Sequence, residues 1–225
     1  GVTGSGVGVA LIDTGITPES GSFAALPEPR PDADVIDAKW FGTCDTSGEN
    51  PVECNNKLIG ARYYNTDEDI VIADRDFLSA RDYNGHGTHT SSTAAGNNGV
   101  PATVNGESVG KISGMAPAAR VAMYKVCWDA KPGASTGCFN SDSVSAIDDA
   151  VADGVDVLNY SIGGTSESSP YDVVEMAFRR AANVGIFVAA SAGNSGPGAS
   201  TLDHPSPWLT TTAASTFRLA ENVVE

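Results

Sequence analysis

Five apolar segments, separated by amphipathic ones, constrain the fold of this chain more than any other feature. Several of them are almost continuous in apolar residues, which is typical of parallel strands buried on both faces of a sheet. The segments cover residues 7–12, 120–126, 155–160, 186–190 and 209–214. We therefore expect a central parallel β-sheet.

Two helical patterns lie between these segments. The first is expected to begin at a Ser141 cap and to stop at Gly154, with an apolar face of Val144, Ile147 and Val151. The second is expected to open at Ser169-Pro170 and to stop at Gly185, with an apolar face of Val173, Ala177, Ala181 and Val184. Strands alternating with helices predict an α/β fold whose sheet is covered on both faces.

Residues 21–80 interrupt this alternation. The stretch is rich in Pro, Asp and Asn and contains one pair of cysteines. We interpret it as an irregular surface insertion in a single domain, because 225 residues with 41% hydrophobic content can bury one substantial core.

The chain is strongly acidic. It has 13 basic and 28 acidic residues, a formal charge of −15, which disfavours nucleic acid and anionic membranes as partners. No run of 18 apolar residues suggests a membrane span, and residues 1–4 do not resemble an export signal. A secreted mature enzyme would show the same pattern.

The four cysteines form two local pairs in the sequence, Cys44 with Cys54 and Cys127 with Cys138. The spacing fits two loop-closing disulfides, and the alternative is free buried thiols. Zinc is disfavoured because neither pair has Cys-x-x-Cys spacing. Disulfides would indicate an oxidising compartment.

Three polar motifs follow predicted strands or open a helix. Asp13 ends the first apolar segment, at the sheet edge where α/β folds place ligands. His86 lies between two glycines and is a candidate general base. Asn194 follows the apolar segment 186–190, and its amide could donate to an oxyanion. Taken singly, each of these residues is better explained by a turn, a cap or a structural role.

A metal site at Asp13, His86 and His89 is the competing interpretation of the histidine motif. Two residues separate the histidines, whereas the His-Glu-x-x-His motif of metalloproteases has three. We interpret His89 as structural and predict no metal among the site residues.

Together the motifs resemble the aspartate, histidine and oxyanion-asparagine motifs of subtilisin-like serine proteases. The chain contains GVALIDTG at 8–15, NGHGTHT at 84–90 and ASAGNSGP at 190–197, in the order that this family uses. CNNKLIGARYY, GMAP and YKVCW, beginning at residues 54, 114 and 124, are similar to the plant cucumisin-type branch and its bacterial relatives. The resemblance covers nearly the whole chain.

The resemblance implies a three-layer subtilisin-like fold, incomplete in this chain, and a secreted endopeptidase that acts on polypeptides. Asp13 would orient His86, His86 would transfer the proton, and Asn194 would stabilise the oxyanion. Two segments would line the peptide groove and the primary specificity pocket: Ser161, Ile162, Gly163 and Gly164, and Ser191, Ala192 and Gly193. Neither segment contains a charge, which favours uncharged or apolar substrate side chains.

The family's nucleophile motif, Gly-Thr-Ser followed by a small or apolar residue and Ala, does not occur in the chain. Ser166 follows Gly164-Thr165, but Glu167 comes next and the tripeptide precedes Asn194, so we assign Ser166 to a surface loop. Residues 1–225 are therefore expected to be the N-terminal part of one catalytic domain. Residues 212–218 resemble the place where this branch carries an inserted protease-associated domain, and a C-terminal segment of the same precursor is expected to supply the serine.

The sequence also leaves two other functions and one ligand to consider. A non-catalytic relative that binds peptides would not need the proton-transferring pair. A dinucleotide-binding protein is disfavoured because Gly4, Gly6 and Gly8 precede the first strand instead of following it. No cofactor is required. Calcium is compatible with the acidic cluster Asp67-Glu68-Asp69, although a solvated loop explains it better.

Overall fold

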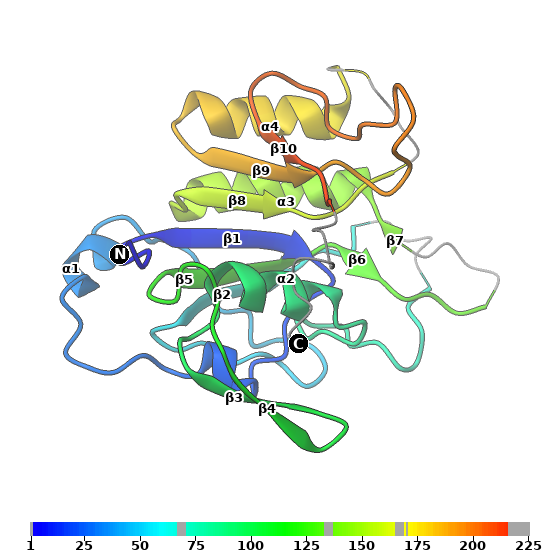
Figure 1. Cartoon of the computed structure of the whole chain (residues 1–225). Coiled ribbons are helices and arrows are strands. Elements are labelled where there is room, and N and C mark those ends of the chain that lie inside the picture. Colours follow the sequence, from blue (N-terminus) through cyan, green and yellow to red (C-terminus); the bar gives the residue numbers. More distant parts are fainter. Residues whose placement is uncertain (1, 67–70, 133–136, 165–168, 170, 216–225) are drawn as a thin grey trace, which may run out of the picture.

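A six-stranded sheet forms the centre of the protein in the computed structural model, which describes residues 2–66, 71–132, 137–164, 169 and 171–215 (Figure 1). Its spatial order is β10-β9-β8-β1-β5-β2, and all neighbouring strands are parallel. The strands are β1 (Gly8–Asp13), β2 (Leu58–Tyr63), β5 (Arg120–Lys125), β8 (Val157–Tyr160), β9 (Phe187–Ser191) and β10 (Thr210–Thr212).

Five of these strands confirm the apolar segments of the sequence. The two central ones, β1 and β5, are buried along their whole length, as near-continuous apolar runs predict. Asp13 ends β1 and pairs with Lys125 at the end of β5. The carboxyl ends of the strands therefore meet at one edge, and Asp13 lies there.

Strand β2 corrects the interpretation of residues 21–80 as irregular throughout. It pairs with β5 at the edge of the sheet, inside the stretch we expected to be an insertion. The strand is hard to recognise because Gly60 and Arg62 interrupt its apolar pattern. Arg62 is accommodated at this edge by an ion pair with Asp153, 2.8 Å from nitrogen to oxygen. The stretch also holds the short helices η1 (Gly21–Phe23) and α1 (Ala33–Asp37).

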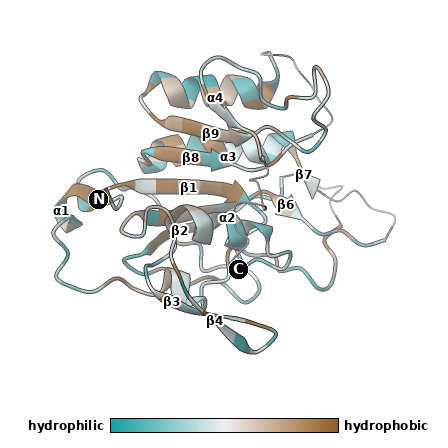
Figure 2. Cartoon of the chain, in the orientation of Figure 1, coloured by the Kyte–Doolittle hydropathy of each residue, from teal (hydrophilic) through white to brown (hydrophobic). Residues whose placement is uncertain are grey.

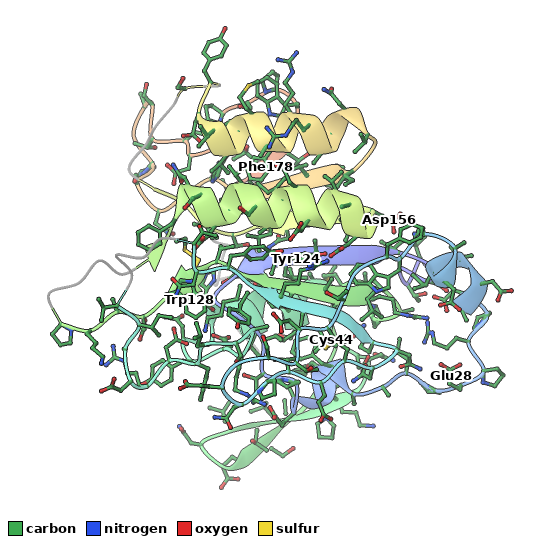
Figure 3. All side chains as sticks on the ribbon, turned by 180° about the vertical axis from the view of Figure 1, so that it is seen from behind. Glu28, Cys44, Tyr124, Trp128, Asp156 and Phe178 are labelled. Carbon is green, nitrogen blue, oxygen red and sulfur yellow. A yellow bond between two sulfur atoms is a disulfide. The ribbon has the colours of Figure 1, made fainter. Side chains whose placement is uncertain are left out.

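Helices cover both faces of the sheet. On β1, Ala10 and Ile12 belong to the core cluster that includes residues of α3 (Asn140–Asp153) and α4 (Val173–Asn183). The alternate residues Val9 and Leu11 belong to a second cluster that includes Ala95 of α2 (His86–Ala95). Figure 3 shows α3 and α4 in front of the sheet, on the side opposite to α2 in Figure 1. The predicted α/β class with a three-layer arrangement is confirmed.

Both predicted helix starts are wrong. Helix α3 begins at Asn140, with Phe139 at its N-cap, so Ser141 lies within the first turn and does not cap it. Helix α4 begins at Val173 instead of Ser169-Pro170, and Pro170 lies outside the described residues. The Asp172 carboxylate accepts a 2.8 Å hydrogen bond from the Val174 N–H and fixes this start. Gly154 ends α3 with a positive φ of 84°, as predicted.

Two smaller sheets complete the described structure. β3 (Val100–Val104) and β4 (Glu107–Ile112) form an antiparallel hairpin, seen below the main sheet in Figure 1, that the sequence analysis missed. β6 (Cys127–Trp128) pairs with β7 (Gly137–Cys138). Hydrophobic residues concentrate in β1 and β9, and the hairpin is mixed in hydropathy (Figure 2).

Both expected disulfides are present, Cys44–Cys54 and Cys127–Cys138. The second joins the paired strands β6 and β7, just before α3. Among the described helices, none is both long and apolar enough to cross a membrane.

Candidate active site

Asp13 lies at the carboxyl end of β1 with no solvent exposure. Its Oδ1 accepts a 2.7 Å hydrogen bond from the Thr14 N–H, and its Oδ2 accepts one of 3.0 Å from the Thr90 hydroxyl. Oδ1 is also 2.7 Å from His86 Nδ1. A carboxylate with several donors is held in one orientation. It can therefore fix the ring it contacts.

His86 is the first residue of α2, and its side chain is 48% exposed although its partner Asp13 is fully buried. The Asp13 carboxylate can only accept, so in the neutral ring the proton belongs on Nδ1. Nε2 then carries the free lone pair, and no described residue hydrogen-bonds to it. This is the protonation state that a general base requires.

Asp82 holds the start of α2, and the sequence analysis missed it. Its Oδ1 accepts hydrogen bonds from the Gly85 N–H (2.9 Å) and the Thr14 hydroxyl (3.0 Å). Its Oδ2 accepts from the N–H (2.9 Å) and hydroxyl (2.6 Å) of Thr88. One buried carboxylate thus joins the loop after β1 to the first turn of α2. The available signal was an Asp four residues before the helix start, although the N-cap itself is Gly85.

The segment before α2 is tied to the Asp13 loop by main-chain bonds. Ile16 N–H donates to Ala80 O (3.0 Å), and Asp82 N–H donates to Ile16 O (3.1 Å). The fully buried Lys125 ammonium donates to Asp76 Oδ1 (2.6 Å) and to the Arg81 carbonyl (2.8 Å). These contacts explain how residues 73 positions apart, Asp13 and His86, come within hydrogen-bond distance.

Gly87 lets α2 approach the Asp13 loop. A Cβ at this position would lie 2.2 Å from the Gly15 carbonyl oxygen and 3.2 Å from the Asp13 Cβ. The helix docks here through the Gly87 N–H, which donates to the Thr14 hydroxyl at 2.8 Å. The small residue after His86 is therefore a requirement of backbone packing.

Replacing Gly87 with alanine is expected to push α2 away from β1 and to lower kcat/KM of the assembled protein about a hundredfold, because a displacement of about 1 Å can cost that much. Steady-state kinetics of the variant measures this loss. Gly198→Ala is the matched control, since its added Cβ meets nothing closer than 3.6 Å. Equal activity of the two variants would contradict the proposed packing role.

The other predicted segments lie at the same edge of the sheet as Asp13. Residues 161–164 follow β8, and residues 191–193 end β9 or follow it. The two segments face each other, because a Cβ built on Gly163 would lie 3.5 Å from the Gly193 Cα. The predicted walls are thus neighbours in the fold, and 161–164 extends beyond β8 without regular strand structure.

Asn194 is exposed and directly follows Gly193, whose φ is +78°. No described residue hydrogen-bonds to its side-chain amide, so the amide is available to an external oxygen. His89 is exposed on α2. Ser166 and the acidic stretch Asp67-Glu68-Asp69 lie outside the described residues.

Within the described parts of the chain, no three His, Cys, Asp or Glu side chains are grouped so as to hold a metal ion. The site is built instead around the Asp13–His86 pair. A buried carboxylate that contacts a half-exposed imidazole thus lies at the carboxyl edge of the parallel sheet.

Comparison with known proteins identifies the class of protein. The subtilase family of peptidases matches residues 4–224. Two Arabidopsis thaliana relatives are subtilisin-like protease SBT1.6, 43% identical over 223 residues, and subtilisin-like protease SBT5.6, 44% identical over 231 residues. Each alignment covers 95% of this chain and 28% of the relative. The chain belongs to the subtilase family.

The chain spans little more than a quarter of the length of these relatives. A solved structure, sphericase, superposes with a TM-score of 0.58 at 23% identity and covers 93% of this chain and 54% of its own. At that identity the likeness shows the fold, which is subtilisin-like.

Proposed function

We propose that this chain is the N-terminal part of the catalytic domain of a secreted serine endopeptidase. The observation that carries the proposal is the 2.7 Å contact between buried Asp13 and His86, whose other ring nitrogen is free. Membership of the subtilase family supports the same reaction. Polypeptides are the proposed substrates.

In the proposed mechanism, a serine hydroxyl attacks the scissile carbonyl and His86 Nε2 takes its proton. Asp13 keeps the proton on Nδ1 and stabilises the imidazolium that forms. The tetrahedral intermediate collapses when His86 gives the proton to the leaving amine, and an acyl-enzyme remains. Water, activated by the same histidine, then hydrolyses the ester.

Asn194 is the proposed oxyanion donor. Its position after β9, two strands from Asp13 in the sheet order, places it at the same carboxyl edge. Its exposed amide has no competing partner among the described residues. A donor that meets the oxygen only when negative charge develops lowers the barrier without tightening substrate binding.

The nucleophile is proposed to come from a further segment of the same precursor. Sequence order supports this assignment, because the family's serine follows the asparagine motif and residues 195–225 contain no Gly-Thr-Ser. The serine that gives its proton to His86 would then join the site when the two segments fold together. Finding no such motif in the encoded full-length protein would overturn this part of the proposal.

The groove between 161–164 and 191–193 is proposed to bind the substrate in an extended conformation. Main-chain hydrogen bonds to an added strand are largely independent of sequence, which suits an endopeptidase. The chemistry requires no cofactor, and a calcium site at Asp67-Glu68-Asp69 stays a hypothesis. The two disulfides support an extracellular location.

Replacing Asn194 with alanine is expected to lower kcat about 100- to 1,000-fold with little change in KM, because its hydrogen bond forms mainly in the transition state. Hydrolysis of a peptide substrate by the full-length protein measures both constants. Asn98→Ala is the control, since Asn98 is also exposed but lies after α2, outside the groove. A purely peptide-binding relative would give no turnover with any variant.

A further inference from the structure

A pocket beside the proposed peptide groove contains an acidic residue that the sequence analysis did not consider. Its lining includes Gly163, Glu175, Asp203 and His204. Asp203 lies between the two walls: Cβ atoms built on Gly163 and Gly193 would be 2.2 and 2.1 Å from its Oδ2. The Asp203 N–H donates to the Ala192 carbonyl at 3.1 Å, which anchors the residue to one wall.

His204 forms an ion pair with Glu175 and none with Asp203. Its Nδ1 is 2.6 Å from Glu175 Oε1 and its Nε2 is 2.7 Å from the Ile162 carbonyl oxygen. Both partners are acceptors, so both ring nitrogens must donate and the ring is an imidazolium. Burial alone would lower the pKa of His204, but the hydrogen bonds to Glu175 and Ile162 raise it above the usual value. Glu175 and His204 thus neutralise each other.

Asp203 is 6% exposed. No described Lys, Arg or His side chain forms an ion pair with it, although its charge helps to raise the pKa of the neighbouring His204. The Asp203 Oδ1 is buried and accepts no hydrogen bond from any described residue. Asp172, which lines the same pocket, already uses its carboxylate to cap α4. A buried carboxylate with an unused oxygen is costly unless a positive group joins it.

Gly163, in one wall of the proposed groove, also lines the pocket, so the pocket opens beside the place proposed for the substrate side chain next to the scissile bond. Asn194, the proposed oxyanion donor, directly follows Gly193. The substrate carbonyl that its amide would bind therefore belongs to a substrate residue beside the walls that contain Gly163 and Gly193. We propose that Asp203, which lines the pocket, makes this a pocket for lysine or arginine, the ammonium or guanidinium group pairing with the Asp203 carboxylate. The inference rests on the proposed protease function and revises the expectation of uncharged side chains, which came from the walls alone.

The test uses the full-length protein and a set of peptides that differ only in the residue before the scissile bond: Lys, Arg, Leu or Phe. We expect the wild type to cleave the Lys and Arg peptides best. Asp203→Asn, which keeps the shape and removes the charge, is expected to lower kcat/KM for these two peptides about a hundredfold and to change the Leu and Phe values severalfold at most. Asp37→Asn removes an exposed charge at the end of α1 and serves as the control.

The measured quantity is the ratio of kcat/KM for Lys to kcat/KM for Leu within one preparation, so incomplete folding of a variant does not alter it. A wild type that prefers Leu or Phe, or an Asp203→Asn variant with an unchanged ratio, would overturn the role of Asp203 and leave the protease function intact. Absence of turnover with all four peptides, together with no labelling by a serine-reactive probe, would instead overturn the proposed function, and the inference with it.

Discussion

Replacing His86 with alanine is expected to lower kcat of the assembled protease about a millionfold, which is the loss known for the equivalent change in subtilisin. The physical reason is that no other described group is placed to take the proton of the nucleophile. His86 is the one described histidine that contacts Asp13, and its Nε2 has no hydrogen-bond partner among the described residues. Single-turnover kinetics with an activated ester or peptide substrate measures the loss.

His89→Ala is the control for this change. His89 lies on the same helix and is also exposed, but it is not the ring that contacts Asp13. We expect this variant to keep its activity within a few fold. If the two histidine variants lost the same activity, His86 would not be the general base, and the effect would belong to α2 as a whole.

Replacing Asp13 with asparagine is expected to lower kcat about 10,000-fold at neutral pH while the fold is kept, as it does for the corresponding aspartate of another serine protease. An amide group facing Nδ1 can donate, which favours the ring tautomer with its proton on Nε2. That tautomer cannot accept the proton of a serine. With the amide oxygen at the Oδ2 position, where the Thr90 hydroxyl donates, the NH2 takes the Oδ1 position beside the ring, and the Thr14 N–H loses its acceptor.

Asp156→Asn is the matched control for Asp13→Asn. Asp156 also bonds to β1, through the Gly8 N–H at 2.7 Å, but at the opposite end of the strand. Its ion pair with Lys39 is partly exposed, so only a small loss of stability is expected. Asp156→Asn should therefore unfold at a slightly lower temperature and keep its kcat, whereas Asp13→Asn should keep its fold and lose kcat. Similar kcat values would mean that Asp13 has only a structural role.

Much of the fold could be predicted because local patterns and tertiary structure agree. Five strands are apolar enough to be recognised from their sequence, and β1 and β5 are buried as such runs require. Strand β2 was missed because it lies at the sheet edge and contains Gly60 and Arg62, whose charge is compensated by Asp153 from α3. That compensation is a tertiary contact, which no local pattern reveals.

The sequence singled out the residues of the candidate site but not the residues that hold them in place. Motif order pointed to Asp13 and His86, and the structure brings them within 2.7 Å. Asp82 and Asp203 escaped notice because each acts across the chain. Asp82 joins the loop after β1 to α2, and Asp203 lies between two glycine walls that the sequence separates by 30 residues. The fold determines which residues Asp82 and Asp203 contact, and no motif with a fixed spacing marks these contacts in the sequence.

The measurement that tests the central claim most directly is labelling of the folded full-length protein with a serine-reactive fluorophosphonate, followed by mass spectrometry of the labelled peptide. We expect the label on one serine C-terminal to this chain, and we expect it to be lost in His86→Ala but kept in His89→Ala. Label on Ser166 would contradict the proposed motif order. A folded protein that takes no label would contradict the assignment of serine protease activity and favour a relative that only binds peptides.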